Sequence, residues 1–251
     1  MLALAALALA GCGHKTRTAR VPTAPPQELA QLDQQHSESS ESAHTSRIPI
    51  TPVPTGGISQ EDIEFVNTHQ PIVTETGYAT WYTAPYKGRR AANGQVFNDH
   101  ALTAAHRTLP MGSLIVVTNL KTGQSSAMRI TDRGPFVDGR IVDLTVASAR
   151  ATGVYRAGLA RVRVDVYETP KPIDTGGRWC VQIGAFHKER EARKLKSQLQ
   201  RNYPDANVIE FPGEDSYWVR IRPEGDNRSQ AESIARRLHP DEGDAFLTRL
   251  D

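Results

Sequence analysis

The sequence has little of several features that mark common classes of protein. Its 251 residues include two cysteines, Cys12 and Cys180, too few for a disulfide framework. Aromatic residues make up only 6% and hydrophobic residues 38%, which is low for a chain packed throughout as one body. The formal net charge of +2 lacks the basic excess typical of nucleic-acid-binding proteins, so no nucleic-acid partner is expected.

Patterns for metal and nucleophilic chemistry are also missing from the sequence. The eight histidines include no pair at HxxxH spacing, and no tight cluster of His, Asp and Glu has the spacing of metal ligands. Cys180 has no obvious base beside it that would activate its thiol. We therefore expect a protein that uses neither a metal nor a cofactor.

The long hydrophobic run of a membrane span is absent as well. Residues 2–10 are all Leu or Ala, shorter than the roughly 20 residues that cross a bilayer. The run ends in Leu9-Ala10-Gly11-Cys12, which resembles a bacterial lipobox. That resemblance implies a signal peptide over residues 1–11, lipidation of Cys12 and a membrane anchor outside the cytoplasm. Gly13, which is not acidic, is compatible with export to the outer membrane.

Residues 12–72 are rich in Pro, Ser, Thr, Gln and His and poor in aromatics. A segment of this composition buries too little apolar surface to offset its ordering entropy, so we predict a flexible tether. One stretch within it, residues 58–66, has Ser59 followed three residues later by Asp62. This spacing fits a capping box and a short helix, with a polar loop as the alternative.

Residues 73–169 change to short β-type runs separated by Gly, Asn and Pro turn signals. Six strands are predicted, at 77–82, 102–105, 114–119, 125–132, 141–144 and 160–167. One short helix is predicted at 146–152, capped by Thr145. Six short strands with little helix favour a small closed or nearly closed barrel. Basic residues outnumber acidic ones here, which suits an anionic polymer, although solvated surface charge is the default explanation.

A Pro- and Gly-containing linker at 170–177 precedes a different architecture at 178–251. Strands are predicted at 178–186, 206–211, 217–222 and 245–250, with helices at 188–202 and 229–238. The order βαββαβ is that of the ferredoxin-like fold, with helices on one face of the sheet. Gln182, Trp218 and Arg220 are expected on the other, open face, where they could bind a sugar. The alternative is an exposed aromatic patch without a ligand.

Asp132 ends a predicted strand directly before a Gly134-Pro135 turn. Such a turn holds the carboxyl at a barrel rim, where loops on a rigid scaffold tend to carry function. The alternative is that Asp132 only ties down the turn by accepting backbone N–H groups. Position alone leaves both open.

Several longer motifs resemble a known family. They are Gly77-Tyr78-Ala79-Thr80-Trp81-Tyr82, Ala92-Asn93-Gly94, Leu102-Thr103-Ala104-Ala105-His106-Arg107-Thr108-Leu109-Pro110, Val117-Thr118-Asn119 and Asp132-Arg133-Gly134-Pro135-Phe136. Together they resemble the rare lipoprotein A family, which implies a double-psi β-barrel. The last part of the chain, with Val181-Gln182-Ile183-Gly184-Ala185-Phe186, is similar to SPOR domains, which bind peptidoglycan glycan strands that lack stem peptides.

The resemblance implies a lytic transglycosylase that cleaves the MurNAc–GlcNAc bond and leaves a 1,6-anhydro product. Asp132 matches the family's catalytic aspartate, and its pKa should be raised because a general acid carries a proton near neutral pH. His106 matches a second site position and is expected to bind Asp132 or substrate, or else to be a half-buried structural histidine. Gln95 stands where active relatives usually have Glu, so it can orient groups but cannot exchange a proton. Asp143 is interpreted as structural.

The resemblance also implies where the protein acts and with what. Its expected partner is denuded peptidoglycan at the division septum, with membrane contact through the lipid anchor and with divisome proteins as possible partners. The expected location is the cell envelope, at the periplasmic face of the outer membrane. A second hypothesis is a non-catalytic glycan-binding or expansin-like, wall-loosening lipoprotein.

Overall fold

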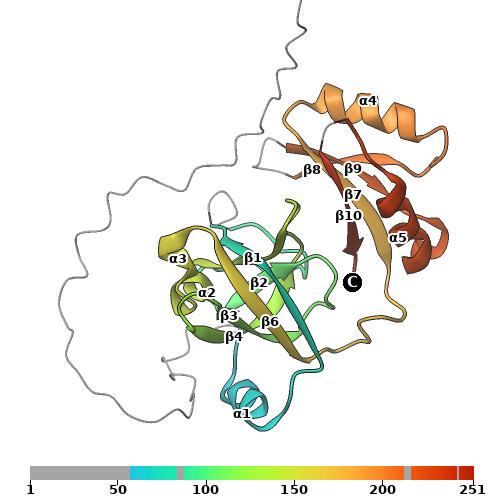
Figure 1. Cartoon of the computed structure of the whole chain (residues 1–251). Coiled ribbons are helices and arrows are strands. Elements are labelled where there is room, and N and C mark those ends of the chain that lie inside the picture. The colour runs from blue at the N-terminus through green and yellow to red at the C-terminus, as the bar shows by residue number, and fades with distance from the viewer. Residues whose placement is uncertain (1–56, 84–87, 212–215, 242) are drawn as a thin grey trace, which may run out of the picture. The chain divides into compact units, whose positions relative to one another are not determined.

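The computed structural model describes residues 57–83, 88–211, 216–241 and 243–251 (Figure 1). The signal peptide, the lipidation site Cys12 and most of the predicted tether lie outside the described residues. No helix among those described is long and apolar enough to cross a membrane.

A closed barrel of six strands forms the first body of secondary structure (Figure 1). Its strands are β1 (Val73–Trp81), β2 (Thr103–His106), β3 (Leu114–Asn119), β4 (Ser125–Asp132), β5 (Arg140–Leu144) and β6 (Ala160–Glu168). They neighbour one another in the order β1-β5-β2-β4-β3-β6, and antiparallel pairing of β1 with β6 closes the ring. The β1–β5 and β2–β4 pairs are parallel. The predicted six-stranded barrel is confirmed.

The barrel interior is filled by β-branched and other apolar side chains from every strand. Ile115, Val117, Met128, Ile130 and Val164 are almost fully buried in one cluster. Side chains alternate between the two faces of a strand, so a short strand needs only two or three apolar residues to fill its share of the interior. This explains why strands of four to nine residues suffice here.

Helix α1 (Gln60–Thr68) begins with the predicted capping box. The Ser59 hydroxyl accepts the Asp62 N–H at 3.1 Å, and the Asp62 carboxylate accepts the Ser59 N–H at 2.9 Å. Val66 and Ile58 are buried against Leu114 and its neighbours on the barrel. The part of the predicted tether from residue 57 onward is therefore ordered, since apolar side chains hidden in a polar segment hold it to the barrel.

Helix α2 (Val146–Ala151) is capped by the Thr145 hydroxyl as predicted, and it is followed by a four-residue helix, α3 (Val154–Ala157), that was not predicted. A helix of four residues is too short to show a 3.6-residue pattern. Both helices lie against the barrel through Ala149 and Val154, which belong to its buried core.

The C-terminal body is a four-stranded antiparallel sheet with two helices. Its elements are β7 (Trp179–Phe186), α4 (Glu189–Leu199), β8 (Asn207–Phe211), β9 (Ser216–Ile221), the 3₁₀ helix η1 (Glu224–Asp226), α5 (Arg228–Arg237) and β10 (Asp244–Arg249). The strand order β10-β7-β9-β8 is that of the ferredoxin-like fold, as predicted. Val181 and Val219 pack with Ala192 of α4 and Ile234 of α5, so these strand residues face the helices as expected.

Candidate active site

Asp132 is the last residue of β4, and its carboxyl is held by backbone groups on two sides. Its Oδ1 accepts the N–H of Ala92 at 2.9 Å and the N–H of Arg133 at 2.8 Å. The first donor lies forty residues away in sequence, so the bond fixes a distant loop over the end of β4. Both contacts use Oδ1, which leaves Oδ2 as the oxygen able to carry a proton.

The turn after Asp132 depends on a backbone that only glycine adopts easily. Gly134 has φ of 140°, where an L side chain would be strained, and a Cβ there would lie 3.8 Å from an Asp143 carboxylate oxygen. The chain leaves β4 through this glycine and turns at residues 137–139. This local geometry places the carboxyl at the barrel rim, as the Gly-Pro sequence predicts.

Burial dominates the electrostatics of Asp132. Desolvation raises the pKa of this carboxyl above its ordinary value, against the opposing effect of its hydrogen bonds to Arg133, Ala92 and Tyr82. The guanidinium of Arg133 also lowers this pKa, but it donates its hydrogen bonds elsewhere, to the carbonyls of His106, Leu109, Arg249 and Asp251. The predicted upward direction of the pKa is confirmed.

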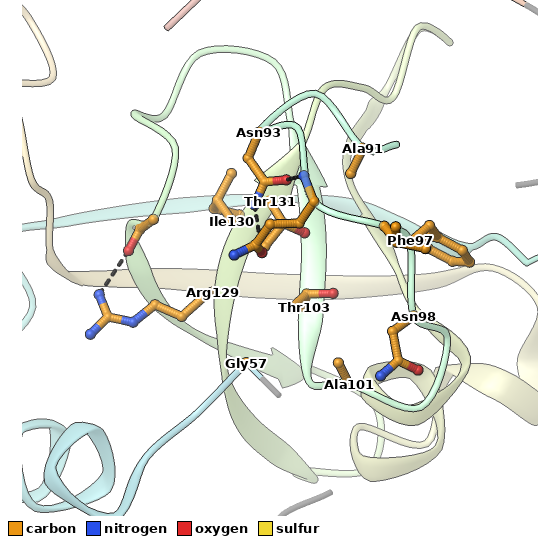
Figure 2. A pocket seen from close by; sticks show the side chains of 13 residues that line it. Gly57, Ala91, Asn93, Phe97, Asn98, Ala101, Thr103, Arg129, Ile130 and Thr131 are labelled. Atoms are coloured by element: carbon orange, nitrogen blue, oxygen red, sulfur yellow. Dashed lines mark hydrogen bonds between the residues drawn. The ribbon is translucent and has the colours of Figure 1, made fainter. Parts of the chain in front are cut away.

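A cavity of about 570 Å³ opens beside Thr131, the neighbour of Asp132 (Figure 2). Asn93 and Gln95 line it from the loop that also supplies the Ala92 N–H. The Asn93 N–H is bonded to the Thr131 carbonyl at 3.1 Å, which holds this loop to β4. Amide and hydroxyl groups therefore border a hollow large enough for a sugar unit.

The Gln95 side chain is exposed and is hydrogen-bonded to Asn93. Its Oε1 accepts a hydrogen bond from Asn93 Nδ2 at 2.9 Å, and its N–H donates to Asn93 Oδ1 at 3.0 Å. The structure thus places Gln95 at the cavity, in the loop whose Ala92 N–H donates to Asp132.

His106 is the last residue of β2, and its ring is hydrogen-bonded to groups other than Asp132. Its Nδ1 accepts the backbone N–H groups of Thr108 and Leu109, at 3.2 and 3.1 Å, so its proton sits on Nε2, which is 3.1 Å from Glu75 Oε2. Burial lowers the pKa of His106, although the Glu75 contact opposes this. Both ring nitrogens thus have protein partners, which fits the alternative of a structural histidine, while a contact with substrate stays a prediction.

Both carboxylate oxygens of Asp143 have protein partners, as expected for a residue with a structural role. Its Oδ1 accepts the Thr80 hydroxyl, and its Oδ2 is 3.0 Å from an Arg140 nitrogen. Burial nevertheless raises its pKa, with Arg140 and Thr80 acting in the opposite direction. Asp143 lies close enough to Asp132 that both carboxyls act on Tyr82.

Two residues next to the site were not assigned from the sequence. Glu75 on β1 faces His106, and Tyr82, which directly follows β1, lies close enough to Asp132 and Asp143 for their charges to raise its pKa. Tyr82 belongs to a motif noted above, but a strand pattern gives no sign of which distant carboxyl its hydroxyl meets. Only the parallel pairing of β1 with β5 and of β2 with β4 brings these groups together.

The three predicted glycan-binding residues lie together in the C-terminal sheet. Gln182 and Arg220 are paired across β7 and β9, and the Arg220 guanidinium donates to Gln182 Oε1 at 2.8 Å. Trp218 packs on Gly184, where a Cβ would lie 2.8 Å from the indole. Gln182 is 0% exposed and Trp218 4%, with the Phe136 ring 5.0 Å from the Trp218 ring. The prediction that Gln182 and Trp218 lie on an open face is therefore wrong, because both side chains are buried. Arg220 is half-buried.

Metal and thiol chemistry find no support among the described side chains. Within that part of the chain no group of three or more His, Cys, Asp or Glu side chains could hold a metal ion. Burial raises the pKa of the Cys180 thiol to about 11, so it stays protonated and unreactive.

The barrel and the C-terminal sheet each match a known family. Residues 74–164 match the model described as lytic transglycolase, and residues 175–249 match the SPOR domain. The fold and these two matches define a double-psi β-barrel of the lytic transglycosylase type followed by a SPOR domain.

Proteins similar in sequence to this chain are named endolytic peptidoglycan transglycosylase RlpA. The probable member from Synechocystis is 49% identical over 107 residues, which cover 41% of this chain and 33% of that protein. The Vibrio cholerae protein is 36% identical over 144 residues, 55% of each chain. A Neisseria meningitidis serogroup A protein is 32% identical over 168 residues, 64% of this chain and 70% of that protein.

The chain belongs to the RlpA family, as its motifs suggested. It spans between a third and just over half of the length of the first two relatives.

Proposed function

We propose that the protein is a lytic transglycosylase that cleaves peptidoglycan glycan strands with Asp132 as its acid. The observation that carries this proposal is a carboxyl with a raised pKa at the end of β4, held by the backbone N–H groups of Arg133 and of Ala92 in the loop that carries the cavity residues Asn93 and Gln95. The family match supports the same activity, since the relatives are named for it.

One carboxyl suffices for this reaction because the substrate supplies the nucleophile. Most glycosidases need two carboxyls, one as the acid and one as the base or nucleophile. Here the protonated Oδ2 of Asp132 would give its proton to the glycosidic oxygen as the bond to C1 breaks. The carboxylate left behind would take the proton of the C6 hydroxyl of MurNAc as that oxygen bonds to C1. The product is a 1,6-anhydro end, and Asp132 ends protonated as it began.

The other predicted site residues support Asp132 in this proposal. Gln95 would orient the substrate by hydrogen bonding from the cavity wall, where it already meets Asn93. His106 would act indirectly, since its ring anchors the 108–109 backbone and Glu75, while its carbonyl holds Arg133.

The test is digestion of denuded peptidoglycan by the purified protein, followed by mass spectrometry of the products. Wild type should generate anhydro-muramyl ends, and Asp132→Asn should generate none. The asparagine Oδ1 can still accept the Ala92 and Arg133 N–H groups, so this variant removes the proton while keeping the contacts. Absence of anhydro ends with both proteins would exclude the proposed catalysis.

A second candidate, a non-catalytic glycan-binding or wall-loosening protein, is favoured by one observation. Gln95 stands at the cavity where active relatives usually carry Glu, and an amide cannot transfer a proton. The same digestion separates the two functions: this candidate predicts retention on peptidoglycan in a pull-down without any anhydro product.

For the SPOR domain we propose binding to denuded glycan strands at the septum, with Arg220, Gln182 and Trp218 as the contact residues. Arg220 is half-buried and pairs with Gln182, so it is the residue of the three that a glycan reaches first. A lipid anchor at Cys12, a location in the cell envelope and divisome partners belong to this proposal. Palmitate labelling of wild type and of Cys12→Ser tests the anchor.

A further inference from the structure

The cavity of about 570 Å³ holds a nearly buried hydroxyl, that of Thr103 on β2 (Figure 2). Thr103 lines the cavity and is only 8% exposed. Its backbone carbonyl accepts the hydroxyls of Thr145 and Ser148, whereas no hydrogen bond joins its own hydroxyl to another residue in the described part of the chain. A polar group that is almost buried and has no protein partner is available to a ligand that enters the cavity.

Apolar and amide groups share the wall around this hydroxyl. Val96 lines the cavity and is 59% exposed although it is large and apolar, and Phe97 and Ala101 add further apolar surface. Asn93 and Asn98 contribute side-chain amides to the same lining. The wall thus combines apolar surface with uncharged hydrogen-bonding groups, which is the mixture that small-molecule sites present.

Among the described residues that line the cavity, Arg129 is the only charged one, and its charge already has partners. Its guanidinium is paired with Asp62 and with Glu168, and it donates to the Gly112 carbonyl at 2.7 Å. Two carboxylates therefore face one guanidinium. An acidic ligand would enter close to two like charges and would find the cation engaged, so the cavity favours a ligand without negative charge.

We propose that the cavity is a subsite for GlcNAc, the uncharged sugar of the glycan strand, and that the Thr103 hydroxyl binds its acetamido group. MurNAc carries a lactyl carboxyl, which is ionised in strands that lack stem peptides, whereas GlcNAc carries no charge. The lining offers a hydroxyl for the acetamido amide and apolar surface for its methyl group. The inference rests on the proposed function, because it names the part of that substrate which the cavity binds.

The subsite lies next in the chain to the proposed acid. Thr131, the residue before Asp132, lines the cavity, and the loop of the lining donates to Asp132 through the Ala92 N–H at 2.9 Å. Asp132 itself is not a lining residue, so the GlcNAc unit in the cavity would be a neighbour of the bond that is cleaved. Thr103 would select the sugar and place the strand, and Asp132 would cleave it.

The test is NMR titration of the full chain with chitotetraose, a neutral oligomer of GlcNAc, and with cellotetraose, which has hydroxyls in place of the acetamido groups. Backbone amide signals of residues 91–103 report on the cavity and separate it from binding at the SPOR domain. Chitotetraose should shift these signals, and cellotetraose should bind roughly tenfold more weakly, because it lacks the group that the hydroxyl binds. Equal affinities for the two sugars, or no shift at these residues with chitotetraose, would overturn the inference.

Thr103→Val is the matched variant, since valine keeps the branched shape of threonine and removes the hydroxyl. It should weaken chitotetraose binding roughly fivefold, the loss of one hydrogen bond between neutral groups. Thr76→Val, at an exposed position of β1, is the control and should bind as wild type does. Wild-type affinity in a folded Thr103→Val protein would overturn the inference.

Val96→Ser decides the matter if Thr103→Val does not fold, because Val96 is exposed and its replacement leaves the barrel core intact. It should weaken chitotetraose binding roughly threefold through lost apolar surface, and wild-type affinity would overturn the inference. The titration needs no turnover. Chitotetraose binding without anhydro ends would defeat the proposed catalysis and support the subsite, whereas anhydro ends without binding at residues 91–103 would defeat the subsite alone.

Discussion

The balance of burial against hydrogen bonding at Asp132 sets the pH range of the proposed reaction. Burial is the larger influence and raises the pKa of the carboxyl, while Ala92, Arg133 and Tyr82 limit the rise. The protonated form is the acid that the reaction needs. The surroundings of Asp132 thus raise the pKa of its carboxyl without a second carboxyl bonded to it.

The first prediction concerns pH. Activity should decline as pH rises through the raised pKa of Asp132. Because this pKa is higher in the folded state, the stability linked to it is complete below the unfolded pKa and is lost as pH rises through the folded value. Asp132→Asn should therefore raise the melting temperature at pH 7 more than at pH 4. The exposed Asp138→Asn is the control, and an equal effect of Asp132→Asn at both pH values would contradict the account.

The second prediction concerns Gln95→Glu. The substitution would place a proton-exchanging carboxyl at the cavity, and Asn93 Nδ2 can donate to it as it does to the amide oxygen. We expect the rate of anhydro-end formation to rise by about tenfold, which is less than the roughly 10²–10⁴-fold that a fully positioned acid or base contributes. Gln124→Glu, an exposed change of the same charge in the β3–β4 turn, should leave the rate unaltered. If Gln95→Glu does not raise the rate of anhydro-end formation, the Gln95 amide already suffices for the reaction.

Among the elements, α1 illustrates how a polar segment becomes part of a barrel. Its capping box fixes where it begins, and the Asp62 carboxylate of that box also pairs with Arg129 of β4. Arg129 in turn donates to the Gly112 carbonyl, 2.7 Å away (Figure 2). The helix is thus attached to the strand that ends at Asp132.

The third prediction tests this attachment. Ser59→Ala should lower the free energy of unfolding by about 1 kcal/mol, because it removes the hydroxyl that accepts the Asp62 N–H. Ser197→Ala in the middle of α4, where the hydroxyl bonds only within its own helix, should change it by less than about 0.5 kcal/mol. Urea unfolding measures both, and equal losses would indicate that the cap contributes nothing specific.

For the molecule as a whole, the barrel and the SPOR domain have separate hydrophobic cores. The barrel cluster draws its buried residues from β1 to β6 and α2 and α3, whereas the SPOR cluster draws its own from residues 179–234. Polar contacts do join them, since Arg133 donates to carbonyls of Arg249 and Asp251. Separate cores indicate that each body can fold by itself.

The fourth prediction follows from this separation. Deleting residues 178–251 should abolish septal enrichment of a fluorescent fusion while the barrel stays folded and keeps its chemistry. The full chain is the reference, and circular dichroism with the anhydro-end assay checks the barrel. Persistent septal enrichment would refute the targeting role, and an unfolded barrel would show that the Arg133 contacts are indispensable to it.

Much of the fold follows from local sequence. The strands at Leu114–Asn119 and Ser125–Asp132 were predicted with the bounds they have, because short β-type runs and flanking turn residues are local signals. Helix α3 and the 3₁₀ helix η1 were missed because three or four residues carry no period. The catalytic roles of Asp132, His106 and Gln95 stay predictions; the structure shows that the loop of Gln95 donates to Asp132 through Ala92 and that the ring of His106 meets Glu75.

The sequence by itself determined the two-body organisation, the turn behind Asp132 and the family, since these rest on composition, backbone preference and motif order. Only the tertiary structure decided what surrounds each polar group. Tyr82 and Asp132 are fifty residues apart, and Gln182 and Trp218 became buried through contacts that no local pattern encodes. The direction of a pKa shift depends on burial and on neighbours that only the folded chain brings together. From the sequence, the raised pKa of Asp132 could be inferred only from its expected role as a general acid. In the structure, burial and the neighbours of Asp132 give the direction of the shift.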